Sequence, residues 1–245
     1  MDGDSLSCWG PTRDGQLEGG TTRSSITPVG VSLPSGRTAS SVTAGDRWTC
    51  AILDDGSAYC WGSNLYGRLG DGTTTDRSTP VAVDLPAGRT ATNLSMGNAH
   101  TCAITDDASI YCWGWNEYGQ LGDGTTTHSS TPVVVSLPIL RTAVSLSAGG
   151  VNTCAIMDDA SAYCWGYNGD GQLGDGTTTD RHTPVAVNLP VGRTATSLSA
   201  GSYHTCAIMD DDSLYCWGQN SDGQLGDGTT TRSITPVAVN LPSGR

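Results

Sequence analysis

The sequence repeats every 52 residues, and this period restricts the possible folds more than any other feature. Cys8, Cys60, Cys112, Cys164 and Cys216 follow one another at this spacing, and no insertion interrupts it. We divide the chain into a partial copy at 1-36 and four full copies at 37-88, 89-140, 141-192 and 193-245. Uniform copies of this size predict a single array of similar units, because one unit alone cannot bury its apolar face.

Each copy has the composition of strands and turns. In residues 89–140, the segments "TATNLSM", "HTCAI", "IYCWG" and "TPVVV" predict four short antiparallel strands, and Pro132 is expected to begin the fourth strand at an outer edge. Helical periodicity is absent. We therefore expect an all-β fold, a β-propeller of 52-residue four-stranded blades. The chain would supply four full blades plus a half-blade, which makes an open or incomplete ring.

The repeated motif resembles a known family. Gly-x-x-His followed by Trp-Gly-x-Asn-x-x-Gly-Gln-Leu-Gly is similar to the regulator of chromosome condensation repeat, which implies a β-propeller, usually of seven blades. The first copy departs from the motif at Thr12 and Glu18, and Trp48 and Asn152 replace the histidine of the other copies. Relatives with this fold serve as nucleotide exchange factors, light sensors, enzyme inhibitors and scaffolds, so the resemblance leaves the function open.

Composition and motifs disfavour several of these functions. No copy carries the insertion that an exchange factor would need, and the tryptophan positions of plant light sensors hold Asp46, Asn98, Gly150 and Ser202. The net charge is -12 and there is no lysine, which disfavours nucleic acid as a partner. No apolar run approaches the roughly 20 residues needed to span a membrane.

The cysteines carry the strongest chemical signal. If residues 54–56 form a three-residue hairpin loop, Cys50 lies directly opposite Cys60, within disulfide reach. The spacing does not fit zinc, and the remaining alternative is buried thiols. Disulfides would favour an oxidising compartment, so we expect an extracellular or cell-surface protein. The same spacing predicts three further bridges: Cys102 with Cys112, Cys154 with Cys164, and Cys206 with Cys216.

Cys8 is the odd ninth cysteine and is left unpaired by this scheme, because its expected partner would lie in two strands that the first copy lacks. Two interpretations follow. The chain is a fragment of a longer array, or its open half-blade packs on, or is disulfide-bonded to, another chain.

Catalysis has little support in the sequence. No nucleophile recurs beside a base, so we expect no enzymatic activity, no catalytic residue and no cofactor. The "LGDGTTT" loops could suggest calcium, but Asp-Gly followed by threonines is typical of turns that bond their own backbone. We expect no metal site, with calcium as the alternative. The aspartates of these loops are Asp71, Asp123, Asp175 and Asp227.

Differences between the copies gather at one end of the expected blades. The loops after strands one and three should share this upper end, whereas the opposite end, with its "DD" turns and "LPxGRT" segments, barely changes. Aromatic residues and arginine dominate binding hot spots, although drift in solvated loops would give a similar distribution. The candidate binding residues are Arg47, Trp48, Tyr66, Trp115, Tyr118, Tyr167, Tyr203 and His204.

The expected function is therefore that of a non-enzymatic extracellular repeat protein. It would act as a structural or assembly unit through its open ends and its variable loop face. The alternative is a secreted recognition module that binds a protein or glycan on the upper face.

Overall fold

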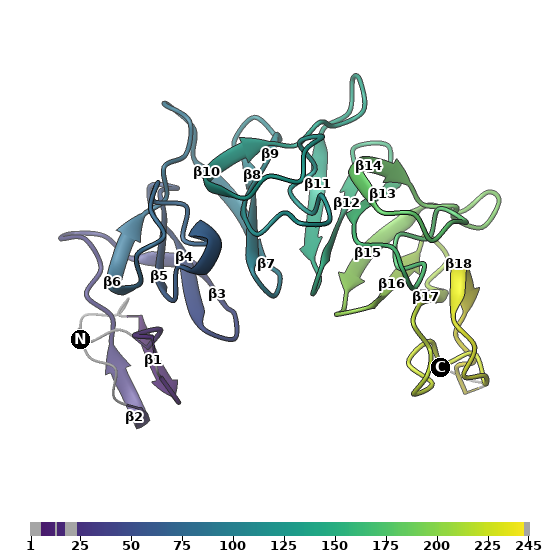
Figure 1. The fold of residues 1–245 in the computed structure, drawn as a ribbon, viewed down its shortest axis with the longest axis horizontal. Helices are drawn as coiled ribbons and strands as arrows, with labels where there is room; N and C mark the ends of the chain where they lie inside the picture. Colours follow the sequence, from purple (N-terminus) through teal and green to yellow (C-terminus); the bar gives the residue numbers. More distant parts are fainter. Residues whose placement is uncertain (1–5, 13, 18–23, 243–245) are drawn as a thin grey trace. The chain divides into compact units, whose positions relative to one another are not determined.

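The structure, a computed structural model, describes residues 6–12, 14–17 and 24–242, so the departure at Glu18 lies outside the described residues. The described residues form four four-stranded sheets and one two-stranded sheet (Figure 1). In each four-stranded sheet the strands follow one another in chain order, as in the blades of a β-propeller. The all-β prediction of four full blades plus a half-blade is confirmed.

The half-blade consists of β1 (Ser7–Gly10) and β2 (Ser25–Gly30). The first full blade contains β3 (Ala39–Ala44), β4 (Trp48–Leu53), β5 (Ala58–Gly62), the short 3₁₀ turn η1 (Leu65–Gly67) and β6 (Arg77–Ala82). The second contains β7 (Ala91–Met96), β8 (His100–Thr105), β9 (Ile110–Gly114) and β10 (Ser129–Val134).

The third blade contains β11 (Ala143–Ala148), β12 (Asn152–Met157), β13 (Ala162–Gly166) and β14 (Arg181–Ala186). The fourth contains β15 (Ala195–Ala200), β16 (His204–Met209), β17 (Leu214–Gly218) and β18 (Ser233–Ala238). Among the described residues, no helix is long and apolar enough to cross a bilayer.

The chain divides into two compact units. The first comprises Met1–Trp115 with His128–Val133, and the second comprises Asn116–Thr127 with Val134–Arg245. Residues 116–127 of the loop that follows β9 therefore belong to the second unit, although β7 to β9, Trp115 and His128 belong to the first.

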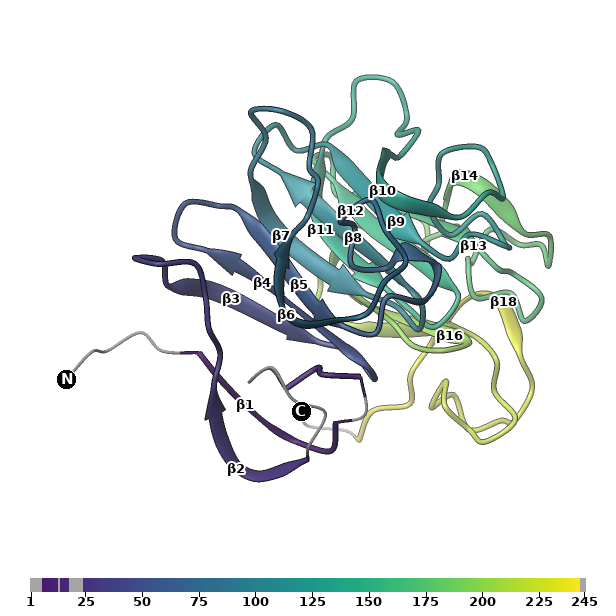
Figure 2. The same ribbon diagram turned by 60° about the vertical axis from the view of Figure 1, so that its left-hand side comes forward.

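Apolar packing between neighbouring blades forms the core of each unit. In the first unit, β7 lies beside β3 and β4 (Figure 2), and Trp48 and Ile52 pack in one cluster with Leu94 and Trp113. In the second unit, the cluster between the third and fourth blades is built around Trp217 and contains the residues Ile156, Leu173, Val187 and Met209. Stacking of blades thus buries the faces that a single sheet would leave exposed.

A backbone carbonyl in the half-blade and in each of the first three full blades accepts two hydrogen bonds from the blade that follows. The Gln120 oxygen accepts the indole N–H of Trp165 and the hydroxyl of Thr153, each at 3.0 Å. Both donors are fully buried. The arrangement recurs at 2.9 to 3.0 Å for Gln16 with Trp61 and Thr49, Arg68 with Trp113 and Thr101, and Gln172 with Trp217 and Thr205.

The fourth strand of each blade begins earlier than the sequence suggested. β10 starts at Ser129, so the expectation that Pro132 begins this strand was wrong. β10 does lie at the edge of its sheet. In the third blade, the equivalent Pro184 lies where the register between β13 and β14 shifts. A bulge in an edge strand tolerates a residue without an amide N–H, and for that reason the strand can continue through the proline.

The four predicted disulfides are present. Cys50 lies directly opposite Cys60 in the register of β4 and β5, with a Cα–Cα distance of 4.1 Å. The amide of Leu53 donates to the Ser57 carbonyl at 2.9 Å, which closes the hairpin as the spacing predicted. The other bridges join Cys102 to Cys112, Cys154 to Cys164, and Cys206 to Cys216. Cys8 lies in β1, outside these four bridges.

Ion pairs explain the constant sequence at the end opposite the long loops. Arg141 bonds to Asp159 at 2.6 Å, which joins the segment before β11 to the β12–β13 turn. Arg37 and Arg89 make the same contact with Asp55 and Asp107. Because these groups are about 40% exposed on the arginine side, the pairs fix the turns more than they stabilise the fold.

One turn at this end departs from its sister copies. Leu140 has a φ of 61°, whereas the equivalent Gly88 and Gly192 have φ values of 81° and 76°. Ile139 and Leu140 are both 91% exposed. A side chain in the left-handed region costs roughly 1 kcal/mol. The hairpin turns at this end accept the same conformation, because Ala108, Ala160 and Asp212 have φ values of 60°, 61° and 64° where the first full blade has Gly56.

The disulfides predict a fixed difference in reactive thiols. Alkylation of the unfolded protein with and without prior reduction should differ by eight modified cysteines, because four bridges each release two thiols. Mass spectrometry of the intact chain measures this difference directly. Equal modification in both samples would show that the cysteines are buried thiols instead.

The hydrogen bonds between blades predict that two equivalent tryptophans contribute unequally to stability. Trp165→Phe should lower the free energy of unfolding by about 1–3 kcal/mol, because it removes a buried donor to Gln120 and leaves a void. Trp9 occupies the same repeat position but is 61% exposed, and Trp9→Phe should cost below about 0.5 kcal/mol. Urea unfolding of both variants checks this, and equal losses would contradict it.

Candidate functional site

Two loops from each blade gather at the same end. The strands alternate in direction, so the loop between the first and second strands and the long loop between the third and fourth strands share one end of their blade. We call this end the loop face. The long loops comprise residues 63–76, 115–128, 167–180 and 219–232, and the short loops comprise 45–47, 97–99, 149–151 and 201–203.

A buried asparagine holds each long loop in shape. The side-chain oxygen of Asn64 accepts the Leu69 amide at 3.0 Å, and its NH₂ group donates to the carbonyls of Thr73 and Thr75 at 3.1 Å. Asn116, Asn168 and Asn220 make the same contacts, and all four are fully buried. With the backbone fixed from inside, the outward-facing positions of these loops are free to vary.

The aspartates of the "LGDGTTT" segments serve the loop itself. Asp71 accepts from the amide and hydroxyl of Thr73 and pairs with Arg77 at 2.7 Å. Burial alone would raise the pKa of Asp71, but these hydrogen bonds and one from Asn64 lower it below its usual value. Within the described part of the chain, no group of three or more His, Cys, Asp and Glu side chains could hold a metal ion.

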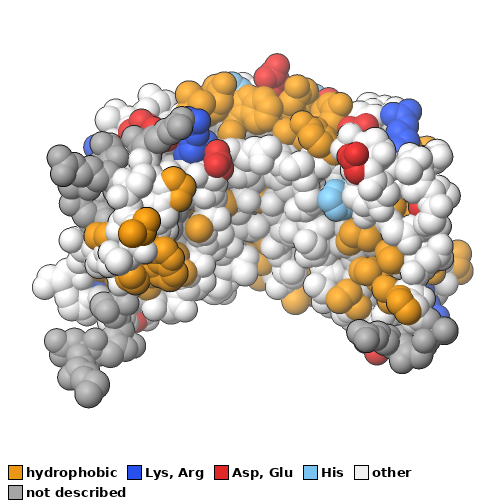
Figure 3. Space-filling model, turned by 90° about the horizontal axis from the view of Figure 1, so that it is seen from below, with side chains coloured by type: hydrophobic (Ala, Val, Ile, Leu, Met, Phe, Trp, Pro, Cys, Tyr) orange, Lys and Arg blue, Asp and Glu red, His pale blue; other side chains and the backbone are white. Residues whose placement is uncertain are grey.

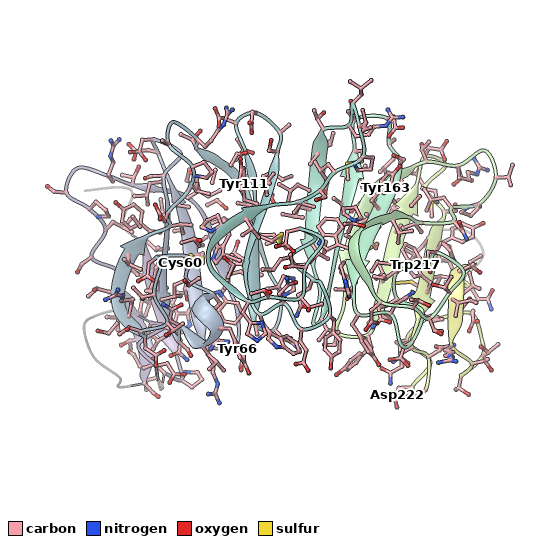
Figure 4. All side chains as sticks on the ribbon, turned by 45° about the horizontal axis from the view of Figure 1, so that its top comes forward. Cys60, Tyr66, Tyr111, Tyr163, Trp217 and Asp222 are labelled. Atoms are coloured by element: carbon pink, nitrogen blue, oxygen red, sulfur yellow. A yellow bond between two sulfur atoms is a disulfide. The ribbon has the colours of Figure 1, made fainter. Side chains whose placement is uncertain are left out.

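A first aromatic cluster lies on the loop face of the first unit. The Tyr66 ring stacks on Trp115 with centroids 6.2 Å apart, and it meets His128 edge-on at 4.9 Å. Tyr66 has a φ of 63° within η1 and is 38% exposed, and its side chain projects from the edge of the blade (Figure 4). His128 was not among the predicted binding residues, although it stands at a position that differs in every neighbouring copy.

A second aromatic cluster lies on the loop face of the second unit. Tyr167 contacts Tyr118 edge-on at a centroid distance of 5.0 Å and Tyr203 at 6.4 Å. Tyr203 is 42% exposed, and the other two rings are half-buried. Hydrophobic side chains, a class that includes tyrosine in this view, gather in patches on the surface (Figure 3).

Three predicted binding residues lie outside both clusters, and one of them is not on the surface. Trp48 is completely buried, its indole donates to the Thr101 hydroxyl at 3.2 Å, and the Arg68 guanidinium lies 4.4 Å from its ring. As the first residue of β4, Trp48 points between two blades, so its side chain cannot be a surface contact. Arg47 is half-exposed beside Asp14 and Asp46, and His204 is half-buried.

The position of Trp48 is buried in two sister blades as well. His100 and Asn152 begin β8 and β12, and both are fully buried. Burial lowers the pKa of His100 from 6.5 to about 4. At neutral pH the His100 ring is therefore uncharged.

Comparisons with known proteins match the repeat throughout the chain. The model of the regulator of chromosome condensation (RCC1) repeat matches residues 55–104, 107–156, 159–208 and 211–245. The Ultraviolet-B receptor UVR8 of Arabidopsis thaliana is 34% identical over 98% of this chain and 54% of that protein. The human E3 ubiquitin-protein ligase HERC2 is 29% identical over 97% of this chain but only 5% of its own length. The chain thus spans about half of one relative and a small part of the other.

Solved structures show the same fold. Prp20p of Saccharomyces cerevisiae, described together with its binding to Gsp1p and histones, has a TM-score of 0.85 and 19% identity over 98% of this chain and 60% of that one. Human WBSCR16 has a TM-score of 0.81 and 22% identity over 93% of this chain and 60% of that one. At this identity the similarity extends to the fold alone.

Burial of His100 predicts an acid-sensitive contribution to stability. His100 of the unfolded chain is protonated below about pH 6.5, whereas His100 of the folded chain is protonated only near pH 4. The free energy of unfolding therefore falls as the pH drops from 6.5 to about 4. At pH 5 the loss from this group is about 2 kcal/mol relative to pH 8. His100→Asn, which copies the buried Asn152, should remove that loss.

Urea unfolding of both proteins at pH 8 and pH 5 measures the effect. Carboxylates contribute equally to both proteins, so the difference between the two pH responses isolates His100. Parallel pH responses would show that His100 keeps an ordinary pKa.

Proposed function

Because the chain belongs to the regulator of chromosome condensation (RCC1) repeat family, we propose that it is a non-enzymatic module that binds other proteins through its loop face. The observation that carries this proposal is the placement of aromatic rings at variable positions of an otherwise constant repeat. Residues 63, 115, 167 and 219 are equivalent, yet they are Ser, Trp, Tyr and Gln. Two of these four side chains belong to the aromatic clusters.

Exposed aromatic rings on a rigid frame suit protein recognition. Tyrosine and tryptophan supply large contact areas with few rotatable bonds, so little entropy is lost when they are buried at an interface. Here the loop backbone is already held by the buried asparagines and by the hydrogen bonds between blades. A partner would therefore meet a preformed surface.

An extracellular setting is part of the proposal. Four disulfides support an oxidising compartment, because such bridges are rare in reducing ones. The other candidate function is that of an assembly unit, in which chains join through their open ends. One observation supports it. A groove of about 490 Å³ runs between the half-blade and the first full blade, lined by Leu6, Trp9 and Val42 among others.

A peptide display library tests the binding proposal. Peptides selected on the disulfide-bonded protein should lose binding to a variant carrying Tyr66→Ala, Trp115→Ala and Tyr167→Ala, because these rings would form the contacts. The matched control carries Ile139→Ala and Leu140→Ala, which remove exposed apolar area from the opposite end. That control should retain binding.

Selection that yields no ring-dependent peptide would overturn the proposal. Light scattering of the same preparation separates the two functions, because a binding module is compatible with a monomer whereas an assembly unit requires oligomers. Oligomers that persist in the ring-truncated variant would favour assembly through the groove.

A further inference from the structure

The tyrosine cluster of the second unit offers π faces to a ligand. Tyr167 is the shared ring, with interplanar angles of 61° to Tyr118 and 77° to Tyr203. When two rings meet edge-on, their faces point in different directions. A ligand group that lies among the three rings can therefore contact more than one ring face. Cations are attracted to such faces within about 6 Å of the ring centroid.

Glycine at position 169 allows Tyr167 to lie over its own loop. A Cβ atom at residue 169 would lie 2.2 Å from the Tyr167 hydroxyl oxygen, so no other residue fits without moving the ring. The equivalent positions hold Leu65, Glu117 and Ser221, and the tyrosine and the glycine occur together in this copy alone among the full copies. The glycine thus leaves room for the Tyr167 ring over the loop.

Two carboxylates lie close to Tyr167. An Asp180 oxygen accepts the amide of Asn168, next to Tyr167, at 2.7 Å, and Asp170 follows three residues after the ring. Burial is the main cause of a raised pKa at Tyr167, and the charges of Asp170 and Asp180 add to it. Glu117 adjoins Tyr118 and is exposed, and Asp222 projects from the long loop of the fourth blade (Figure 4).

The basic groups nearby are engaged with the protein. Arg232 donates to the Gly169 carbonyl at 3.0 Å, and Arg181 pairs with Asp175 at 2.7 Å. Asp170 and Asp180 are the carboxylates whose charges act on Tyr167. The whole chain has a net charge of -12, so its field also attracts cations to this surface.

We propose that Tyr118, Tyr167 and Tyr203 bind the cationic side chain of an arginine- or lysine-containing peptide. The ring faces contact the cation and the nearby carboxylates balance its charge. This inference rests on the proposed protein-binding function and specifies the partner of one of its two clusters.

The test uses a hexapeptide of alternating arginine and glycine and a counterpart in which neutral citrulline replaces arginine. Calorimetry with the disulfide-bonded protein should show binding of the arginine peptide, and the citrulline peptide should bind about tenfold more weakly or not at all. Tyr167→Ala should weaken the arginine peptide about fivefold or more. Tyr167→Phe keeps the ring face and should bind as the wild type does.

Ile139→Ala, which removes an exposed apolar side chain at the opposite end of the blades, is the matched control and should leave this affinity unchanged. Equal affinity of the Tyr167→Ala variant would overturn the inference, because binding would then follow from diffuse negative charge. Equal binding of the citrulline peptide, or no binding of the arginine peptide, would also overturn it. Display peptides that need the loop-face rings but lack arginine and lysine would refute the cation site while leaving the protein-binding function intact.

Discussion

The structure depends on one shared acceptor at each junction between neighbouring blades. A backbone carbonyl, such as that of Gln120, receives both a tryptophan indole and a threonine hydroxyl from the following blade. These bonds are buried, and a buried donor left without an acceptor would cost free energy. The long loop is therefore part of the packing between blades as well as a surface feature. This explains why the tryptophan at the position of Trp165 recurs in every full copy.

The hydrogen bonds that hold the long loops involve the constant positions and leave the variable positions at the surface. Asn168 and the carbonyl of Gln172 face inward and hold the backbone, whereas Tyr167 and Asp170 face outward. Substitution at the outward positions does not disturb the hydrogen bonds between blades. A repeat of this kind can thus change its surface without losing stability, and the aromatic clusters occupy the positions where that freedom exists.

Part of the candidate site followed from the sequence. The variable positions at the loop end identified Tyr66, Trp115, Tyr118, Tyr167 and Tyr203, and the structure brings all five into two clusters. Trp48 was misplaced because a residue at the boundary of a loop and a strand can face either way. His128 was missed because its variable position gives no indication of which ring it will contact.

The sequence by itself determined the blades. A 52-residue period, alternating strand composition and cysteines ten residues apart specify local pairing, because hairpin register follows from loop length. Only the tertiary structure decided which side chains meet across blades. The burial of Trp48 and the ring contacts of Tyr167 depend on residues roughly one repeat away in the chain. Such contacts arise from the packing of one sheet on the next, and the pattern within a single copy does not contain them.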